Sequence, residues 1–286
     1  MSMKSTLPSP NVSIEISGGF GNQLFQLAAA EHLRSYGIKV SLDFTVNQRN
    51  GVRDNLITDI AEKLSFPYLE LASWQTILWR IPVLRRIFSL PKGARVVNED
   101  EEFLVPPVIV TDQKVVYRGY WQNIHSAATI REEISDHFEI YPKAVVARIA
   151  LHVRRGDYLQ GENPNFHGVL SGEYYVAAVN SIRSKIGFLP VVVFTDSPNL
   201  VSNEKWTAEI ADLTFSESLG IFEDFVEIAN SYAIVCSNST YSWWAAYISK
   251  SESIVLPSQW QVRLDIPEGL RQARAEIVSA FFVGQD

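Results

Sequence analysis

The pattern of hydrophobic positions alternates between short apolar runs and longer stretches with helical spacing. Near the N-terminus, Val12–Ile16 (VSIEI) alternates apolar and polar residues, and Ile38–Phe44 (IKVSLDF) does the same. Between them, residues 22–36 contain neither glycine nor proline, and Gly37 follows directly. Period-two alternation predicts strands, and the uninterrupted stretch between them predicts a helix that stops at the glycine. The first part of the chain therefore reads as a strand–loop–helix–strand unit, which is typical of α/β proteins.

A second series of the same kind starts near residue 147. Its strands are expected where the chain is short, apolar and β-branched, and its helices where apolar residues recur every three or four positions. The expected strands are Ile149–Val153, Pro190–Phe194, Ala233–Cys236 and Ser253–Leu256, and the expected helices cover residues 174–185, 222–229 and 242–248.

The two series together predict an α/β protein with two domains. We expect residues 1–145 to form an N-terminal, acceptor-side domain and residues 146–286 to form a C-terminal, donor-binding domain, with the boundary near Pro142. Ligands of open parallel sheets bind beyond the carboxyl ends of the strands, so a cleft between the two halves is the expected site.

The composition narrows the class of protein. The 286 residues carry a net charge of −7, which argues against a protein that wraps duplex nucleic acid, because such proteins carry a basic excess. The single cysteine, Cys236, excludes an internal disulfide framework and fits a reducing compartment. Residues 1–10 lack the apolar core of a signal sequence, and no apolar run reaches about 18 residues, so we expect a cytoplasmic protein.

One segment leaves two interpretations open. Residues 74–90 (WQTILWRIPVLRRIFSL) mix large apolar side chains with three arginines. Such a segment either lies on an anionic membrane surface, in this case the inner membrane, or is an amphipathic helix of a soluble fold that breaks at Pro82. The second interpretation is favoured, because basic amphipathic stretches are common in soluble proteins.

The loop after the first strand reads Gly18-Gly19-Phe20-Gly21-Asn22-Gln23. Glycines between a strand and a helix let backbone N–H groups approach an anion, so Gly19 and Gly21 are candidate ligand-binding residues. A dinucleotide fingerprint would place a third glycine where Leu24 stands, and would use Asp43 for a ribose. This partial match keeps an NAD-type oxidoreductase as an alternative, beside a non-catalytic sugar- or nucleotide-binding module and a tight turn without any ligand.

Two adjacent arginines follow the apolar strand Ile149–Val153, in the sequence HVRRGDY (152–158). Desolvated guanidinium groups need an anion, and their geometry suits phosphate oxygens. Because strand alternation sends Arg154 and Arg155 to opposite faces, we expect one to grip a ligand and the other to hold a carboxylate such as Asp157.

Polar residues also follow the strand Ala233–Cys236, in the sequence SNSTYSWW (237–244). Hydroxyl groups at the start of a helix either cap it or bind phosphate, and capping is the commoner role.

Two carboxylates of the second series are also candidate ligand-binding residues. Asp196 follows a strand, and Asp224 lies on the helix whose buried face we expect to be Phe222, Phe225, Val226 and Ala229. Asp224 either complements the helix dipole or accepts two hydrogen bonds from a guanine edge.

These motifs resemble those of a known family. In order, SGGFGNQLFQLAAA, GYWQN (119–123), HVRRGDY, HGVLSGEYY (167–175), FTDSP (194–198) and SNSTYSWWAAY resemble the motif series of glycosyltransferase family 11. This family contains the bacterial and animal galactoside α-1,2-fucosyltransferases. The resemblance runs from about residue 13 to residue 260. Leu27 and the WWAAY ending depart from residues that are common in the family, which affects the expected fit of the acceptor more than use of the donor.

The resemblance implies a GT-B-like fold with two Rossmann-like domains and an inverting transfer from GDP-β-L-fucose to the 2-hydroxyl of a galactoside, without a metal or other cofactor. It implies that His152 and Asp224 contact guanine and that Arg154 and Arg155 serve the diphosphate and the fold of the motif. Asp196, Ser239, Thr240 and Tyr241 complete the expected donor site. The base that takes the acceptor proton is left open: Asp157 and Glu162 are candidates, Asn22 or Gln23 would orient the acceptor, and a cation-like sugar could react without a strong base. The acceptor glycan and the oligomeric state do not follow from the sequence.

Overall fold

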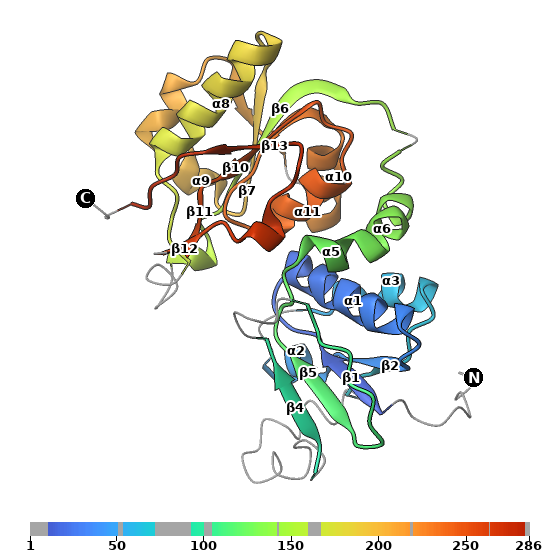
Figure 1. Ribbon diagram of the computed structural model, residues 1–286. Helices are drawn as coiled ribbons and strands as arrows, with labels where there is room; N and C mark the ends of the chain where they lie inside the picture. Colours follow the sequence, from blue (N-terminus) through green and yellow to red (C-terminus); the bar gives the residue numbers. More distant parts are fainter. Residues whose placement is uncertain are drawn as a thin grey trace. The chain divides into compact units, whose positions relative to one another are not determined.

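The chain divides into two compact units, residues 1–130 and residues 131–286 (Figure 1). The computed structural model describes residues 11–50, 54–71, 93–99, 105–141, 143–159, 167–217, 220–262 and 264–283. The division falls at residue 130, earlier than the sequence suggested, because helix α6 (Arg131–His137) belongs to the second unit. There the Arg131 guanidinium donates to the carbonyl of Tyr247 at 3.1 Å.

The first unit is built on a parallel sheet whose described strands lie in the order β3-β2-β1-β5-β4. Helix α1 is buried along most of its length, since Leu24, Phe25 and Leu27 are all inaccessible to solvent. The strands are β1 (Val12–Glu15), β2 (Val40–Asp43), β3 (Tyr68–Leu69), β4 (Arg95–Asn98) and β5 (Val115–Arg118). The helices are α1 (Phe20–Ser35), α2 (Thr45–Asn50), α3 (Thr58–Lys63) and α5 (Ile124–Ala127).

The second unit is also built on a parallel sheet, with described strands in the order β13-β10-β9-β6-β7-β8. Its strands are β6 (Val146–Val153), β7 (Val191–Thr195), β8 (Leu213–Phe215), β9 (Ser231–Val235), β10 (Ser253–Pro257) and β13 (Ala275–Val278), with a separate hairpin of β11 (Gln259–Gln261) and β12 (Leu264–Asp265). Its other helices are α8 (Gly172–Ile186), α9 (Pro198–Val201), α10 (Ile221–Ala229) and α11 (Thr240–Ile248).

Each sheet has a point where the strand order reverses. In the first unit the chain moves from β1 to β2 and β3 on one side, and it returns through β4 and β5 on the other. In the second unit it moves from β6 to β7 and β8, and then from β9 to β10 and β13 on the opposite side. At such a switch point the neighbouring loops part and leave room for a ligand at the carboxyl ends of the strands. The switch points are therefore β1/β5 and β6/β9.

The structure confirms the expected α/β class, with a Rossmann-like sheet in each half of the chain as in GT-B-like proteins. The expected strands and helices are present with small shifts at their ends. Two residues of the expected buried face of α10 are not buried, since Val226 is only half-buried and Phe222 is exposed. Phe222 is 37% exposed, because it stands in the first turn of α10. One neighbour is Phe138, whose ring centroid lies 5.9 Å from that of Phe222. The buried face of α10 consists of Phe225, Ile228 and Ala229.

The question of membrane contact concerns a segment outside the described residues, since residues 72–92 contain all of 74–90. Among the residues that are described, no helix combines the length and the apolar character that crossing a bilayer requires.

Candidate functional site

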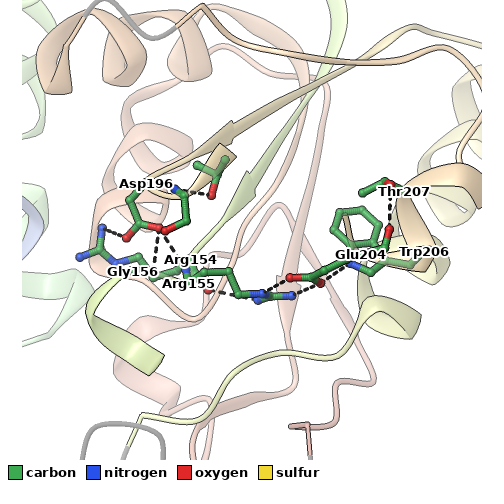
Figure 2. Close-up of polar contacts among 9 residues, drawn as sticks. Arg154, Arg155, Gly156, Asp196, Glu204, Trp206 and Thr207 are labelled. Carbon is green, nitrogen blue, oxygen red and sulfur yellow. Dashed lines mark hydrogen bonds and ion pairs between the residues drawn. The ribbon is translucent and has the colours of Figure 1, made fainter. Parts of the chain in front are cut away.

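Arg155 lies at the end of β6 and is almost wholly buried, with 2% of its surface exposed. Its Nε and Nη2 atoms donate to the two carboxylate oxygens of Glu204 at 2.7 and 2.9 Å, and its Nη1 donates to the Arg154 carbonyl at 3.1 Å (Figure 2). The indole of Trp206 also donates to Glu204. Burial would lower the pKa of Arg155, but the two hydrogen bonds that it donates to Glu204 raise this pKa above its ordinary value. Arg155 therefore stays charged inside the unit.

Arg154 points to a different carboxylate. Its Nη1 lies 2.8 Å from Oδ2 of Asp196, which follows β7, and about a quarter of each side chain remains exposed. Oδ1 of Asp196 accepts from the backbone N–H groups of Arg155 and Gly156 at 3.1 and 3.0 Å (Figure 2). A β-carbon on Gly156 would stand 2.4 Å from Asp196, so the close approach requires glycine at this position. Burial raises the pKa of Asp196, but Arg154 and the two N–H groups more than offset this and lower it.

The two arginines thus bind different carboxylates, and Arg155 is buried whereas Arg154 is partly exposed. One arginine was expected to hold a carboxylate such as Asp157, and Arg155 holds the carboxylate of Glu204. Arg155 also does not fit its expected place among the donor-binding residues, since its guanidinium is enclosed and bound to Glu204. Arg154 keeps the exposure that a ligand contact requires. The side chain of Asp157 and the whole of Glu162 lie outside the described residues.

His152 connects the two strands at the switch point. It lies on β6 with 4% of its surface exposed, and its Nδ1 is 2.8 Å from the Ser237 hydroxyl, which follows β9. Its ring centroid lies 5.3 Å from that of Tyr241. Burial, with a smaller contribution from the Arg154 charge, lowers the pKa of His152 to about 3. The imidazole is therefore neutral at physiological pH and can serve as a hydrogen-bonding group, but not as a cation.

The start of α11 lies in the same place. Ser239 occupies the N-cap position in an extended conformation and makes no side-chain capping hydrogen bond. The plain capping role favoured for these hydroxyl residues is thus not observed at Ser239. The Asn238 carbonyl accepts from the Tyr158 hydroxyl at 3.0 Å, which ties the loop to the residues after β6. Trp243 and Trp244 are wholly buried, as is Cys236, so all three belong to the core.

Asp224 stands in the first turn of α10, and its Oδ1 accepts from the Ser216 hydroxyl at 3.2 Å. The Tyr241 hydroxyl donates to the Ile221 carbonyl at 2.6 Å, so the first turns of α10 and α11 are joined. Burial raises the pKa of Tyr241, and the nearby charge of Asp224 raises it further. The ring of Tyr241 thus lies beside that of His152, and Asp224 is near enough for its charge to act on Tyr241.

In the first unit, the glycine loop is braced by glutamine side chains. Gln23 is wholly buried and donates to the carbonyls of Gly18 and Asp54 at 2.9 and 2.8 Å, so it cannot reach an acceptor as the sequence suggested. Gln26 accepts from the Ser17 N–H at 2.9 Å and donates to the Gly119 carbonyl at 2.9 Å. These contacts join the loop after β1 to the loop after β5.

The other candidates of the first unit differ in accessibility. Asn22 is half-buried, and its Oδ1 accepts from the Gln122 amide at 3.1 Å. Gly19 holds the N-cap position of α1, where an added β-carbon would meet nothing within 4 Å, and Gly21 is buried in the first turn of α1. Asp43, proposed for a ribose in the oxidoreductase alternative, accepts at Oδ1 from both the N–H and the hydroxyl of Thr45. The Asp43 carboxylate thus holds the residue two positions further along the chain, which removes support from the oxidoreductase alternative.

Sequence reasoning missed two carboxylates of these networks. Glu204 holds Arg155, and Glu99 accepts from the backbone N–H groups of Tyr120 and Gln122 at 2.6 and 3.2 Å. Both partners are distant in the sequence, so spacing offered no signal. Within the described residues, His, Cys, Asp and Glu side chains form no group of three that could hold a metal ion.

Known proteins resemble this chain over much of its length. The model of glycosyl transferase family 11 matches residues 110–263. The O-antigen biosynthesis glycosyltransferase WbnK of Escherichia coli is 27% identical over 86% of this chain and 93% of its own length. An α-1,2-colitosyltransferase of the same species is 23% identical over 89% of this chain and 94% of its own length. A galactoside α-(1,2)-fucosyltransferase 1 of Saimiri sciureus is 26% identical, but only over 46% of this chain and 41% of its own length. Since the family model matches more than half of the residues of this chain, the chain belongs to glycosyltransferase family 11.

Proposed function

We propose that this family 11 glycosyltransferase moves L-fucose from GDP-β-L-fucose to the 2-hydroxyl of a β-galactoside, with inversion to an α-1,2 linkage. Two of the relatives are named for α-1,2 transfer, one of colitose and one of fucose to a galactoside. The observation that carries the proposal is the group of partly exposed Arg154, neutral His152 and Asp224 at the β6/β9 switch point. The oxidoreductase alternative does not account for this group, and the non-catalytic alternative is disfavoured by membership of a glycosyltransferase family.

The diphosphate is the leaving group, so its growing negative charge must be stabilised in the transition state. Arg154 offers a guanidinium that Asp196 holds in place, and the first turn of α11 offers backbone N–H groups. Donors that are already oriented toward developing charge contribute several kcal/mol to lowering a barrier. In this mechanism Arg154 contacts the phosphates, and Ser239 and Thr240 line them.

The guanine of the donor is recognised by other groups than the diphosphate. Guanine presents two adjacent N–H donors, whereas adenine presents no such pair, and the carboxylate of Asp224 matches the guanine pattern. Ser216 and the first turn of α10 hold this carboxylate. Neutral His152, fixed by Ser237, supplies a second hydrogen-bonding group without adding charge. We expect GDP to bind much better than ADP for this reason.

The acceptor hydroxyl must lose a proton as the new bond forms. Asp157 and Glu162 remain the candidate bases, close after the two arginines in the sequence. In the other route left open, the departing diphosphate leaves a cation-like sugar that reacts with the hydroxyl without a strong base.

The test compares transfer rates from a set of donors to lactose, using GDP-fucose, GDP-mannose and GDP-colitose, which carries the 3-deoxy analogue of L-fucose. We expect turnover with GDP-fucose and its loss in Arg154→Ala. The matched control is Arg148→Ala, which removes another ion pair of β6, the one with Glu227 at 3.0 Å. Faster turnover with GDP-colitose would replace the proposed donor, and equal rates for the two variants would remove Arg154 from the mechanism.

A further inference from the structure

The loop that follows β5 in the first unit is held in an unusual conformation. The carboxylate of Glu99 accepts from the backbone N–H groups of Tyr120 and Gln122, one to each oxygen, at 2.6 and 3.2 Å. Between them, Trp121 has a φ of +56°, a left-handed value that is costly for a bulky residue and tends to occur at functional sites. The Trp121 side chain is wholly buried and anchors the loop. This loop is therefore built to present its two neighbours in a fixed orientation.

Tyr120 is the aromatic side chain that the loop presents, and 39% of its surface is exposed. It lies against the glycine loop after β1, because a β-carbon on Gly18 would be 3.1 Å from Cε1 of Tyr120 and 3.0 Å from Nδ2 of Asn22. Gly18 has a φ of +78°, so both its backbone and its lack of a side chain allow the ring and the amide to meet there. The ring of Tyr120 and the amide of Asn22 are thus neighbours.

A second amide extends this surface. Nε2 of Gln122 donates to Oδ1 of Asn22 at 3.1 Å, so the three side chains are contiguous. Gln26 fixes the two loops relative to each other through Ser17 and Gly119. The result is an exposed aromatic ring beside two primary amides at the β1/β5 switch point, where ligands of such sheets bind.

Among the described residues, two carboxylates and one guanidinium near this surface have partners within the protein. Glu15 and Arg118, at the ends of β1 and β5, form a bidentate pair at 2.8 and 2.9 Å, and the Glu99 carboxylate is taken up by the loop itself. A phosphate group would require an available guanidinium or ammonium group. A neutral ligand that has hydroxyl groups and an apolar face matches the surface better, because amides both donate and accept hydrogen bonds and an aromatic ring packs on C–H groups.

We propose that Tyr120, Asn22 and Gln122 form the binding site for a neutral pyranose ring of the acceptor, with Glu99 and Trp121 as positioning residues. The identity of the ligand as an acceptor sugar rests on the proposed function.

The test measures acceptor kinetics at saturating GDP-fucose, with lactose as the acceptor. Tyr120→Ala and Gln122→Ala should each raise the KM for lactose at least tenfold. The Kd for GDP and the acceptor-free hydrolysis of GDP-fucose should change less than twofold. Tyr36→Ala is the matched control, since Tyr36 is an exposed tyrosine of the same unit at the end of α1, and its KM should equal that of the parent. An unchanged KM in Tyr120→Ala, or a matching loss of GDP affinity, would overturn the proposal.

A second measurement does not depend on the donor. Methyl β-D-galactopyranoside serves as the probe in saturation-transfer NMR with the full chain and no nucleotide. We expect a saturation-transfer signal from the parent protein and from Tyr36→Ala. Tyr120→Ala should lose this signal while its melting temperature equals that of the parent. An equal signal in Tyr120→Ala would refute the site even if fucosyl transfer is observed. The expected signals in a protein that does not use GDP-fucose would support the site and refute only the proposed donor.

Discussion

Removing the carboxylate of Glu204 should destabilise the second unit far more than removing that of a more exposed ion pair. In Glu204→Ala the guanidinium of Arg155 would lose both charge-assisted hydrogen bonds while it is still 2% exposed. Leaving a buried charge without its partner costs about 3–5 kcal/mol. For a unit of this size, each kcal/mol lowers the melting temperature by roughly 2–4 °C, so the expected decrease is about 6–20 °C.

The control is Glu227→Ala, which breaks the pair with Arg148. The Glu227 side chain is 42% exposed, and pairs of that kind contribute about 0–1 kcal/mol. A double variant, Arg155→Met with Glu204→Leu, replaces both charges by apolar groups of similar size, and it should recover most of the lost stability. The assay is thermal unfolding followed by circular dichroism at pH 7. Equal and small decreases for Glu204→Ala and Glu227→Ala would show that Arg155 is not held as the structure indicates.

Three further predictions follow from the same site. Unfolded histidine takes up a proton near pH 6.5, whereas His152 stays neutral down to about pH 3. Between these pH values the unfolded state binds more protons than the folded state, so the folded state loses stability as the pH is lowered. The loss is about 2 kcal/mol at pH 5. In His152→Gln the decrease in melting temperature between pH 7 and pH 5 should be smaller, and an unchanged decrease would contradict the buried neutral state. Asp224→Asn should weaken GDP binding at least tenfold, about 1.4 kcal/mol, in calorimetric titrations of GDP and ADP; unchanged GDP affinity in the folded variant would make Asp224 a helix-terminus charge only. Transfer activity should survive EDTA, since arginine and backbone donors are assigned to the phosphate charge; loss of activity that Mn²⁺ or Mg²⁺ restores would show that this assignment is incomplete.

The sequence was sufficient for the elements that local patterns determine. The apolar runs located β6, β7, β9 and β10, and the glycine after residue 36 located the end of α1. The sequence also led to the expectation that Arg154 and Arg155 contact different groups, and their partners do differ. In each of these cases the information lies within a few residues, which is the range over which period and capping signals act.

Long-range pairings could not be predicted in the same way. Glu204 reaches Arg155 only because α9 and the turn after it return to the end of β6, and no spacing rule connects residues that far apart. Glu99 and Gln26 are comparable cases, because they brace loops that only the sheet brings together. Phe222 fits the apolar period of α10, but it stands in the first turn, where the helix is no longer covered. Periodicity identifies a face of a helix, but not how far along the helix that face is buried.

The most direct test of the proposed reaction is the structure of its product. The full chain is incubated with GDP-β-L-fucose and lactose, and the trisaccharide is isolated and analysed by NMR. The proposal predicts an α-anomeric fucose whose C1 is linked to O2 of galactose. A β-anomer, a linkage to another hydroxyl, or fucose released only to water would contradict it.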